Sequence, residues 1–280
     1  MDTLKIKCYA KVNLTLDVWQ KKEKYHPIKS LVSTIGIYDD LIIKRRNDYK
    51  VTLKTKGNKL NVPREKNNAY IAVASFMKKH KTFGADITLI KRIPESAGLG
   101  GSSADIAGAL KGMNELYETQ DDLESLASSL GSDVNFLLEG GFCEISGRGE
   151  RVEKLPELKK QYVIVLTAKQ GVGARECYEN FDNRKETPSP VTDIVKEEFL
   201  KTGKINYKLL KNDLTLSAKS INAQIGANEA ALKAYDCEAV LMSGSGSAVY
   251  GIFSDEKKRD SAYRQLKKFY KKNIIKTETV

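Results

Sequence analysis

The sequence predicts an α+β protein built in two parts, and two kinds of pattern support this prediction. Apolar and polar residues alternate from Ile6 to Val18, which is typical of a half-buried strand. Apolar residues recur every three or four positions in segments such as 106–117, which is typical of an amphipathic helix. Both patterns occur before and after residue 155, so we expect two α+β domains, residues 1–155 and 156–280.

The first part begins with the strand over 6–18, in which every even position is apolar. Lys11 and Asn13 lie on its polar face and therefore point the same way. The helix over 70–77 follows the capping residues Asn67 and Asn68. Other expected strands are 41–44, 50–54 (after a turn through Asn47 and Asp48), 86–90, 142–145 and 152–155, and other expected helices are 106–117 and 123–130.

The second part opens with a strand over 161–167, followed by three helical patterns up to about residue 234. Strands over 237–242 and 248–253 flank a Gly/Ser turn, and a basic helix leads to a β-prone stretch over 274–280. The basic residues of 257–272 accompany apolar residues at helical spacing, so we interpret them as a solvated helix face rather than a nucleic-acid surface.

Composition limits the classes of function. The chain of 280 residues is 41% hydrophobic and 30% charged, which is ordinary for a globular protein. No stretch approaches the ~20 apolar residues of a membrane span, and the start lacks the apolar core of a signal peptide, so we expect a cytoplasmic protein that does not bind membranes. The four cysteines are far apart, which predicts neither disulfides nor a zinc site. The net charge of +11 suits acidic ligands or nucleic acid.

A glycine- and serine-rich loop runs from Pro94 to Asp105, between a predicted strand and a predicted helix. Glycines let the backbone approach an anion closely, and the N-terminus of the following helix is electropositive. A nucleotide polyphosphate is therefore the most economical ligand. The loop matches neither of the common nucleotide-binding glycine motifs, so a plain strand-to-helix turn remains the alternative.

Four other features suggest chemistry, and each has a simpler explanation. Asp133 is either a catalytic carboxylate or a helix N-cap. Lys11 is either the partner of that carboxylate or an ordinary lysine in contact with solvent. Tyr25 and His26 suit a site that stacks on and hydrogen-bonds a planar ring, although such pairs in exposed loops are usually incidental. The cluster Ser243–Ser247 suits a second ligand loop or an ordinary hairpin connection.

Together these features resemble the motifs of the GHMP kinases, the superfamily of galactokinase, homoserine kinase and mevalonate kinase. The matching segments are Ala10–Leu14, Tyr25-His26, Pro94–Asp105, Leu130–Val134, Asn212–Leu214 and Ser243–Ser247. The similarity extends from about Lys7 to Phe253, nearly the whole chain. The family usually has glycine where Lys24 and Ser102 stand, an acidic residue where Pro27 stands and proline where Asn135 stands.

The resemblance implies a two-domain fold, with an N-terminal domain like ribosomal protein S5 domain 2, a ferredoxin-like C-terminal domain and the active site in the cleft between them. It implies ATP-dependent phosphorylation of a hydroxyl on a small molecule, a cytidine diphosphate-linked polyol, with ATP and Mg²⁺ as cofactors and a monomer or homodimer as the enzyme. The implied catalytic residues are Asp133 and Lys11. The implied ATP-binding residues are Pro94, Gly98, Leu99, Gly100, Gly101, Ser102 and Ser103, and the implied substrate-binding residues are Asn13, Tyr25, His26, Tyr178, Gly244 and Ser245. No metal ligand is assigned.

Two alternatives stay open from the sequence. A diverged kinase with the same fold would phosphorylate another small alcohol, such as mevalonate or homoserine. A non-catalytic protein would bind RNA or sense nucleotides, but such a protein needs neither Lys11 nor Asp133.

Overall fold

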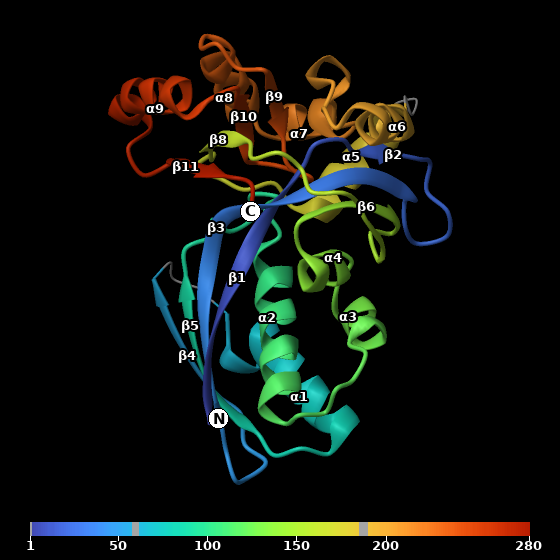
Figure 1. Ribbon diagram of the computed structural model, residues 1–280, viewed down its shortest axis with the longest axis vertical. Coiled ribbons are helices and arrows are strands. Elements are labelled where there is room, and N and C mark those ends of the chain that lie inside the picture. The colour runs from blue at the N-terminus through green and yellow to red at the C-terminus, as the bar shows by residue number, and fades with distance from the viewer. Residues whose placement is uncertain (1, 58–61, 185–189) are drawn as a thin grey trace. The chain divides into compact units, whose positions relative to one another are not determined.

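The computed structural model describes residues 2–57, 62–184 and 190–280, and strands and helices follow one another throughout the chain (Figure 1). The chain forms two compact units, and neither is one continuous stretch of sequence. The first unit comprises the residues up to Ala10 with Ile37–Ile93 and Gly100–Glu139. The second comprises Lys11–Gly36, Pro94–Leu99 and Gly140–Val280.

The first unit contains parts of two long strands, β1 (Thr3–Asn13) and β3 (Ile28–Arg45), with β4 (Thr52–Gly57) and β5 (Ala85–Lys91). β3 pairs antiparallel with β5, whereas β4 pairs parallel with it. The strands expected at 41–44 and 50–54 are therefore not sheet neighbours, because β5 lies between them. A parallel pair needs a crossover, and the helix between β4 and β5 supplies it.

The helices of this unit confirm the sequence patterns. α1 (Asn68–His80) is capped by Asn67, whose side chain accepts a hydrogen bond from the amide of Ala69 (2.9 Å). α2 (Gly101–Leu116) follows the Gly/Ser loop, and α3 (Glu124–Leu130) ends at Gly131, as expected. A short helix, α4 (Val134–Glu139), follows Asp133, as the N-cap interpretation of that residue implies, whereas a 3₁₀ turn, η1 (Arg64–Lys66), was not predicted. α1 and α4 both pack against α2.

The second unit has two groups of strands. The first half of β3 pairs with β2 (Asp17–Val18) and β6 (Phe142–Gly147). β6 also pairs antiparallel with β7 (Arg151–Lys154), and these two strands were expected at 142–145 and 152–155. A separate antiparallel sheet has the order β11-β8-β10-β9. Its strands are β8 (Tyr162–Leu166), β9 (Ala239–Met242), β10 (Val249–Phe253) and β11 (Ile274–Glu278).

Five α-helices belong to the described part of this unit. They are α5 (Ala174–Arg184), α6 (Thr192–Thr202), α7 (Thr215–Ile221), α8 (Gln224–Lys233) and the basic α9 (Glu256–Tyr270), with a 3₁₀ turn, η2 (Tyr207–Leu209). α8 and α9 pack on the sheet of β8 to β11 (Figure 1). α5 was not predicted, while the three patterns that follow it were correct. No helix in the described ranges is long and apolar enough to cross a membrane.

Two strand boundaries differ from the sequence pattern. The first strand ends at Asn13 instead of Val18, because the amides of Leu14 and Thr15 both point to the carbonyl of Leu31 (2.7 and 3.4 Å) and break the ladder. β3 begins at Ile28, well before the expected strand at 41–44. Its first half is buried on both faces, so it lacks the alternation by which a strand is recognised.

Candidate active site

The Gly/Ser loop joins the end of β5 to the start of α2, as the sequence predicts. Gly100 has φ 73° at the N-cap of α2, a conformation that glycine adopts without strain. The first amides of a helix have no intrahelical acceptor, so those of Gly101, Ser102 and Ser103 can bind an anion. Ser102 is exposed and Ser103 is half-buried. This end of the loop is suited to phosphate.

The other side of the loop, Pro94–Leu99, lies against the second Gly/Ser cluster. Gly98 has φ +74°, and a Cβ added there would lie 2.0 Å from the carbonyl oxygen of Ser243. The Ser243 hydroxyl donates to the carbonyl of Gly98 (2.9 Å), and the amide of Ala248 donates to that of Ala97 (3.0 Å). Ser243–Ser247 is therefore more than a hairpin connection, because it also supports the loop.

Leu99 differs from the other loop residues that were expected to bind ATP. Its side chain is only 1% exposed, and its carbonyl accepts a hydrogen bond from the amide of Lys11 (3.0 Å). Its side chain belongs to the core, so any contribution to ligand binding comes from its backbone.

Asn13 is the centre of a polar cluster in the second unit. Its Oδ1 accepts hydrogen bonds from Lys11 Nζ (2.6 Å) and from the amide of Gly244 (2.9 Å). Its Nδ2 donates to the hydroxyl of Ser30 (2.8 Å), and its carbonyl accepts from the hydroxyl of Tyr250 (2.7 Å). The expectation that Lys11 and Asn13 point the same way is confirmed.

The alternative of a solvated lysine at position 11 is wrong. Lys11 is 4% exposed and Asn13 is 2% exposed, so the polar face of this strand is buried where the strand was expected to face water. Buried polar groups require partners, and the hydrogen bonds of Asn13 meet this requirement. Ser30 and Tyr250 contribute to the cluster but were not found from the sequence, because they lie 17 and 237 residues from Asn13 in the chain.

The motif Asn212–Leu214 also has a structural role. Asn212 Nδ2 donates to the carbonyls of Met242 (2.9 Å) and Gly244 (2.8 Å), which holds the second Gly/Ser cluster in place. Asp213 accepts a hydrogen bond from the amide of Val18 (3.0 Å). These two neighbouring residues therefore tie both β2 and the Gly244 turn to one segment of chain.

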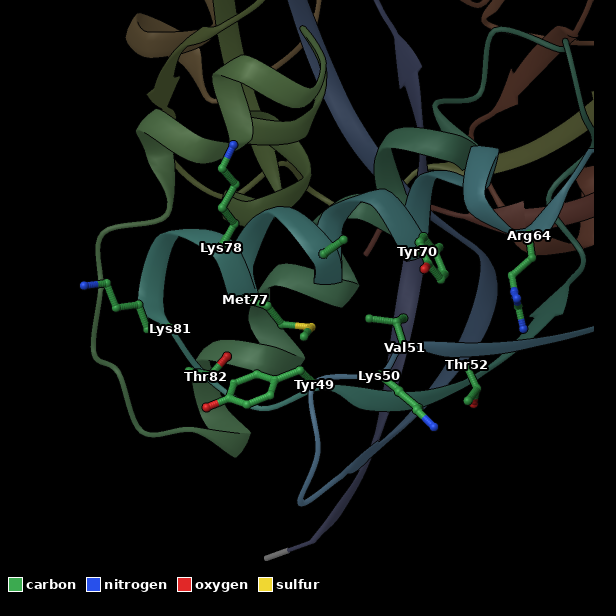
Figure 2. Close-up of a pocket in the computed structure, with 11 residues that line it drawn as sticks. Tyr49, Lys50, Val51, Thr52, Arg64, Tyr70, Met77, Lys78, Lys81 and Thr82 are labelled. Atoms are coloured by element: carbon green, nitrogen blue, oxygen red, sulfur yellow. The ribbon is translucent and has the colours of Figure 1, made fainter.

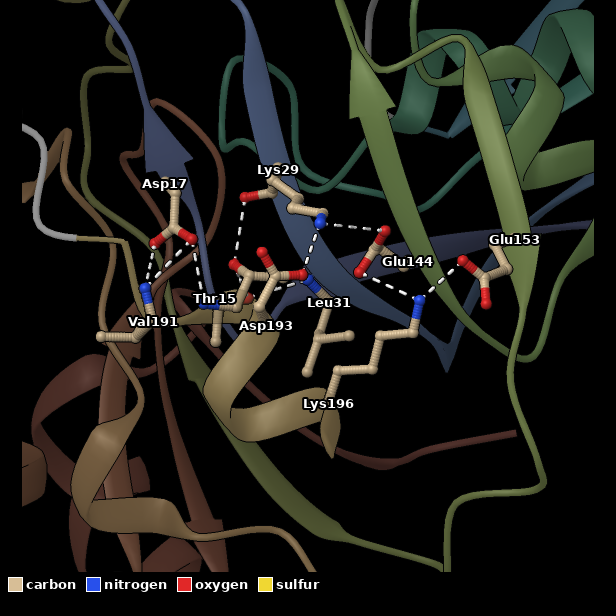
Figure 3. Close-up of polar contacts among 10 residues, drawn as sticks. Thr15, Asp17, Lys29, Leu31, Glu144, Glu153, Val191, Asp193 and Lys196 are labelled. Atoms are coloured by element: carbon tan, nitrogen blue, oxygen red, sulfur yellow. Dashed lines mark hydrogen bonds and ion pairs between the residues drawn. The ribbon is translucent and has the colours of Figure 1, made fainter. Parts of the chain in front are cut away.

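The chain that follows Asn13 is held by a second polar network, which Figure 3 shows. The Asp17 carboxylate accepts from the amides of Val191 (3.0 and 3.1 Å) and Thr192 (2.9 Å), at the positive N-terminus of α6. Lys29 forms ion pairs with Asp193 and Glu144, and the pKa of Lys29 is raised mainly by its hydrogen bond to Asp193. These contacts fix the segment that leads from the Asn13 cluster to the Tyr25-His26 turn.

Tyr25 and His26 lie in very different environments. Tyr25 is 54% exposed, and the guanidinium of Arg148 lies 5.1 Å from the centre of its ring. His26 is buried, and its ring stacks on Tyr178 with 5.0 Å between ring centres. The two ring nitrogens of His26 face the carbonyl of Trp19 (2.9 Å) and the carboxylate of Asp182 (3.3 Å).

The expected second stacking ring, Tyr178, thus lies against His26. The more accessible aromatic surface belongs to Tyr25. Arg148, in the turn between β6 and β7, was not singled out from the sequence, because nothing local links it to a tyrosine more than one hundred positions away.

Asp133 lies in the first unit, directly before α4, and is half-buried. Its carbonyl accepts a hydrogen bond from the amide of Leu137 (3.1 Å), as the carbonyl of an N-cap residue does. The neighbouring Gly131 lies close to Ser103, since a Cβ added to it would be 3.6 Å from the Ser103 hydroxyl. Asp133 therefore follows a segment that packs on the start of α2.

A separate hollow of about 630 Å³ lies in the first unit, between the start of β4 and α1 (Figure 2). Tyr49, Met77 and Thr82 lie around its middle, and Lys78 and Lys81 lie at its edge. None of the residues expected to bind ATP or substrate lines it.

The GHMP kinase models match both halves of the chain. A model of the N-terminal domain of GHMP kinases matches residues 67–142, and a model of their C-terminal domain matches residues 192–272. Together with the loop and helix geometry, this defines the class: the chain belongs to the GHMP kinase family and is an ATP-dependent kinase.

Individual relatives are more specific. The chain is 33% identical to the 4-diphosphocytidyl-2-C-methyl-D-erythritol kinase of Clostridium beijerinckii, over 99% of this chain and 100% of that protein. It is 37% identical to the kinase of the same name from Carboxydothermus hydrogenoformans, over 92% of this chain and 91% of that one.

Solved structures agree with these relatives. The crystal structure of a 4-(cytidine 5'-diphospho)-2C-methyl-D-erythritol kinase matches with a TM-score of 0.83 at 27% identity, and the match covers 99% of both chains. Homoserine kinase from Cytophaga hutchinsonii has a TM-score of 0.72 at 16% identity and shares the fold. The predicted two-domain α+β kinase fold is confirmed.

Proposed function

We propose that this protein transfers the γ-phosphoryl group of ATP to the 2-hydroxyl of 4-diphosphocytidyl-2-C-methyl-D-erythritol, a step of the non-mevalonate isoprenoid pathway, in the cytoplasm. The observation that supports it most strongly is similarity along nearly the whole chain to kinases of that name, at 33% and 37% identity. The geometry of the polar groups in each unit agrees with a phosphoryl transfer of this kind.

In this proposal Asp133 accepts the proton of the acceptor hydroxyl as its oxygen attacks the γ-phosphorus. The new O–P bond forms while the bond to the β-phosphate breaks, and ADP leaves. The Lys11 ammonium offsets the negative charge that develops on the transferred group. Asn13 holds that ammonium through a hydrogen bond of 2.6 Å and helps to orient the acceptor.

The triphosphate is assigned to Pro94, Gly98 and Leu99 of the loop and to Gly100–Ser103 at the start of α2. Support comes from the positive φ values of Gly98 and Gly100, a backbone conformation found in anion-binding loops. Gly244 and Ser245 are assigned to the substrate side, because the Gly244 amide is held by Asn13 (2.9 Å).

Tyr25, His26 and Tyr178 are assigned to the cytosine of the substrate. We give Tyr25 the stacking role, since it is the exposed ring, and His26 and Tyr178 the role of supporting it as a stacked pair. Arg148 adds a positive charge beside Tyr25, which suits a base that carries a diphosphate.

Magnesium is expected to arrive with ATP. In the residues that the structure describes, no group of three or more His, Cys, Asp or Glu side chains is arranged to hold a metal ion. This fits Mg²⁺, which keeps several waters and binds largely through substrate phosphates. When bound, it would neutralise phosphate charge, and we assign it no protein ligand.

The division into domains 1–155 and 156–280 is retained as part of the proposal. The two family models support it, since one ends at residue 142 and the other begins at residue 192. In this proposal the first domain contributes the start of α2 and Asp133, and the second contributes Tyr178, Gly244 and Ser245.

An ADP-release assay across candidate alcohols tests the proposal. We expect turnover with ATP, magnesium and the cytidine substrate, and none with mevalonate or homoserine. Asp133→Ala is expected to abolish it, whereas Asp122→Ala, an exposed carboxylate in the segment before α3, is the matched control and retains it. Turnover of a different alcohol, with none of the cytidine substrate, would refute the proposed acceptor. Full activity of Asp133→Ala would refute the proposed mechanism.

A further inference from the structure

A buried cluster of charged side chains joins the two ends of the Gly/Ser loop, Pro94–Asp105. It consists of Asp39 on β3, Lys91 at the end of β5 and Asp105 near the start of α2, which are 0%, 4% and 3% exposed. Lys91 Nζ donates to Asp105 Oδ2 (2.7 Å) and also to Asp39 Oδ2. One ammonium thus connects the strand that leads into the loop to the helix that follows it.

The same cluster fixes the backbone at the beginning of the loop. Asp39 Oδ1 accepts hydrogen bonds from the amides of Arg92 and Ile93, the latter at 2.9 Å. Gly101 packs on this stem, because a Cβ added to it would lie 2.9 Å from Ile93 Cγ2 and 3.7 Å from Lys91 Nζ. The first residue of α2 is therefore held directly above the charged cluster.

The charges of the cluster do not balance when both carboxyl groups are ionised, since two carboxylates meet one ammonium. Among the described residues, Asp105 Oδ1 has no hydrogen-bond partner. Burial raises the pKa of Asp105 to about 7; the Lys91 charge opposes this rise and the Asp39 charge adds to it. Burial lowers the pKa of Lys91, but the negative charges of Asp105 and Asp39 have the larger effect, so the pKa of Lys91 is raised overall.

The other groups that face the cluster do not supply the missing positive charge. Cys8 on β1 is buried, and burial followed by the negative charge of Asp105 raises the pKa of its thiol, so it stays neutral. Asp40 on β3 is paired with Arg92 (2.6 Å) and Lys5 (3.7 Å). The cluster is therefore neutral with a proton on Asp105 and carries one net negative charge without it.

We propose that Asp105 is a positioning residue for the nucleotide phosphates: its proton keeps the Asp39–Lys91–Asp105 cluster neutral beneath the first turn of α2, and its ionisation weakens phosphate binding there. Loss of the proton places a negative charge under the helix end that would receive the triphosphate. This charge repels the negatively charged phosphates and weakens their binding. The proposal rests on the proposed function only in assigning the phosphates to Gly100–Ser103.

The test measures the dissociation constants of ADP and ATP by calorimetry from pH 6 to pH 8.5, in the protein and in Asp105→Asn. Asparagine has the shape of the protonated acid but does not ionise. We expect nucleotide affinity of the parent to fall roughly three- to tenfold more than that of Asp105→Asn across this range. ATP itself titrates near neutral pH, but this contribution is the same for both proteins and cancels in the comparison.

Asp86→Asn is the matched control, because Asp86 lies on β5, the strand of Lys91, but forms its ion pair with Arg46 (2.6 Å). It is expected to keep the pH dependence of the parent. Identical pH dependence in the parent and Asp105→Asn would overturn the proposal, as would the same loss of dependence in Asp86→Asn.

A second measurement separates this inference from the proposed function. The turnover number with the cytidine substrate is expected to be parent-like in the control Asp86→Asn at pH 6.5, because Asp86 is paired with Arg46 and does not belong to the cluster. A parent that binds ADP with the expected pH dependence but does not phosphorylate the cytidine substrate would refute the proposed acceptor and support the role of Asp105.

Discussion

The polar groups beneath the phosphate loop and those around Asn13 are equally buried, yet they are built from different chemistry. In the first unit Lys91 donates to the carboxyl groups of Asp39 and Asp105, and in the second unit Lys11 donates to the amide oxygen of Asn13. Ionised partners bind an ammonium strongly but make the cluster sensitive to pH. A neutral amide fixes the position of the ammonium without cancelling its charge.

The difference suggests a division of labour. A lysine that has to offset the charge of a transferred phosphoryl group can be positioned by an amide oxygen, which adds no negative charge of its own. A lysine that holds a loop to a strand can be paired with carboxylates, since its charge is not used. The predictions below test this contrast, beginning with the largest expected effect.

Replacing Lys11 by methionine removes the cation that we propose to be catalytic and keeps most of the length of the side chain. We expect the turnover number to fall by roughly 10³ and ADP affinity to change little, because the charge matters mainly in the transition state. Steady-state kinetics and calorimetry measure the two effects, and thermal unfolding verifies the fold.

Lys7→Met is the control for this variant. Lys7 lies on the same strand, but its ammonium lies over the exposed side of Tyr38, 4.7 Å from the ring centre. Parent-like activity of Lys11→Met, or equal losses in both variants, would contradict the special role of Lys11.

Asn13→Asp places a carboxyl group beside the Lys11 ammonium, as Asp39 and Asp105 do beside Lys91. A carboxylate can still accept from Lys11 and from the amide of Gly244, so the variant is expected to fold. We expect a loss of roughly 10- to 100-fold in the turnover number, since the carboxylate cancels the lysine charge before the reaction.

Ser30→Ala is the companion variant. It removes the hydrogen bond from Asn13 Nδ2 but adds no charge. A loss in Ser30→Ala as large as that in Asn13→Asp would show that geometry, and not charge, distinguishes the two clusters.

The charged cluster predicts how stability changes with pH. The folded-state pKa of Asp105 is about 7 against an ordinary value of 3.8. Between these values the folded protein keeps a proton that the unfolded chain has released, so this residue's contribution to stability falls as pH rises from about 4 to about 7 and is constant above.

Urea unfolding of the parent and Asp105→Asn at several pH values measures this contribution. We expect the free energy of unfolding of the parent, relative to that of the variant, to fall by about 2 kcal/mol between pH 5 and pH 7. The opposite slope, or a constant difference, would show that Asp105 is ionised throughout.

Arg148→Ala is expected to have the smallest effect. A cation near the face of an exposed ring contributes about 0.5–1 kcal/mol, so the KM for the cytidine substrate should rise two- to fivefold with an unchanged turnover number. Arg151→Ala, on the neighbouring strand β7, is the control. An unchanged KM would show that Arg148 does not contribute to binding of the cytidine substrate.

Local patterns were enough for most elements, and for the site residues that lie in compact motifs. The alternation around Lys11 and Asn13 placed both on one face of a strand, and the glycines from Gly98 to Gly101 marked a loop before a helix. The elements that were missed are explained by the same physics. The first half of β3 is buried on both faces and shows no alternation, and α5 has few apolar residues to reveal its period.

The sequence by itself thus determined the kinase family and the order of most strands and helices, because these depend on local periodicity and short motifs. Only the tertiary structure decided which groups share a cluster. Lys91 meets Asp39 and Asp105 across 52 and 14 residues, and Asn13 meets Gly244 across 231. Burial and charge pairing between such distant positions follow from packing, which no local pattern encodes.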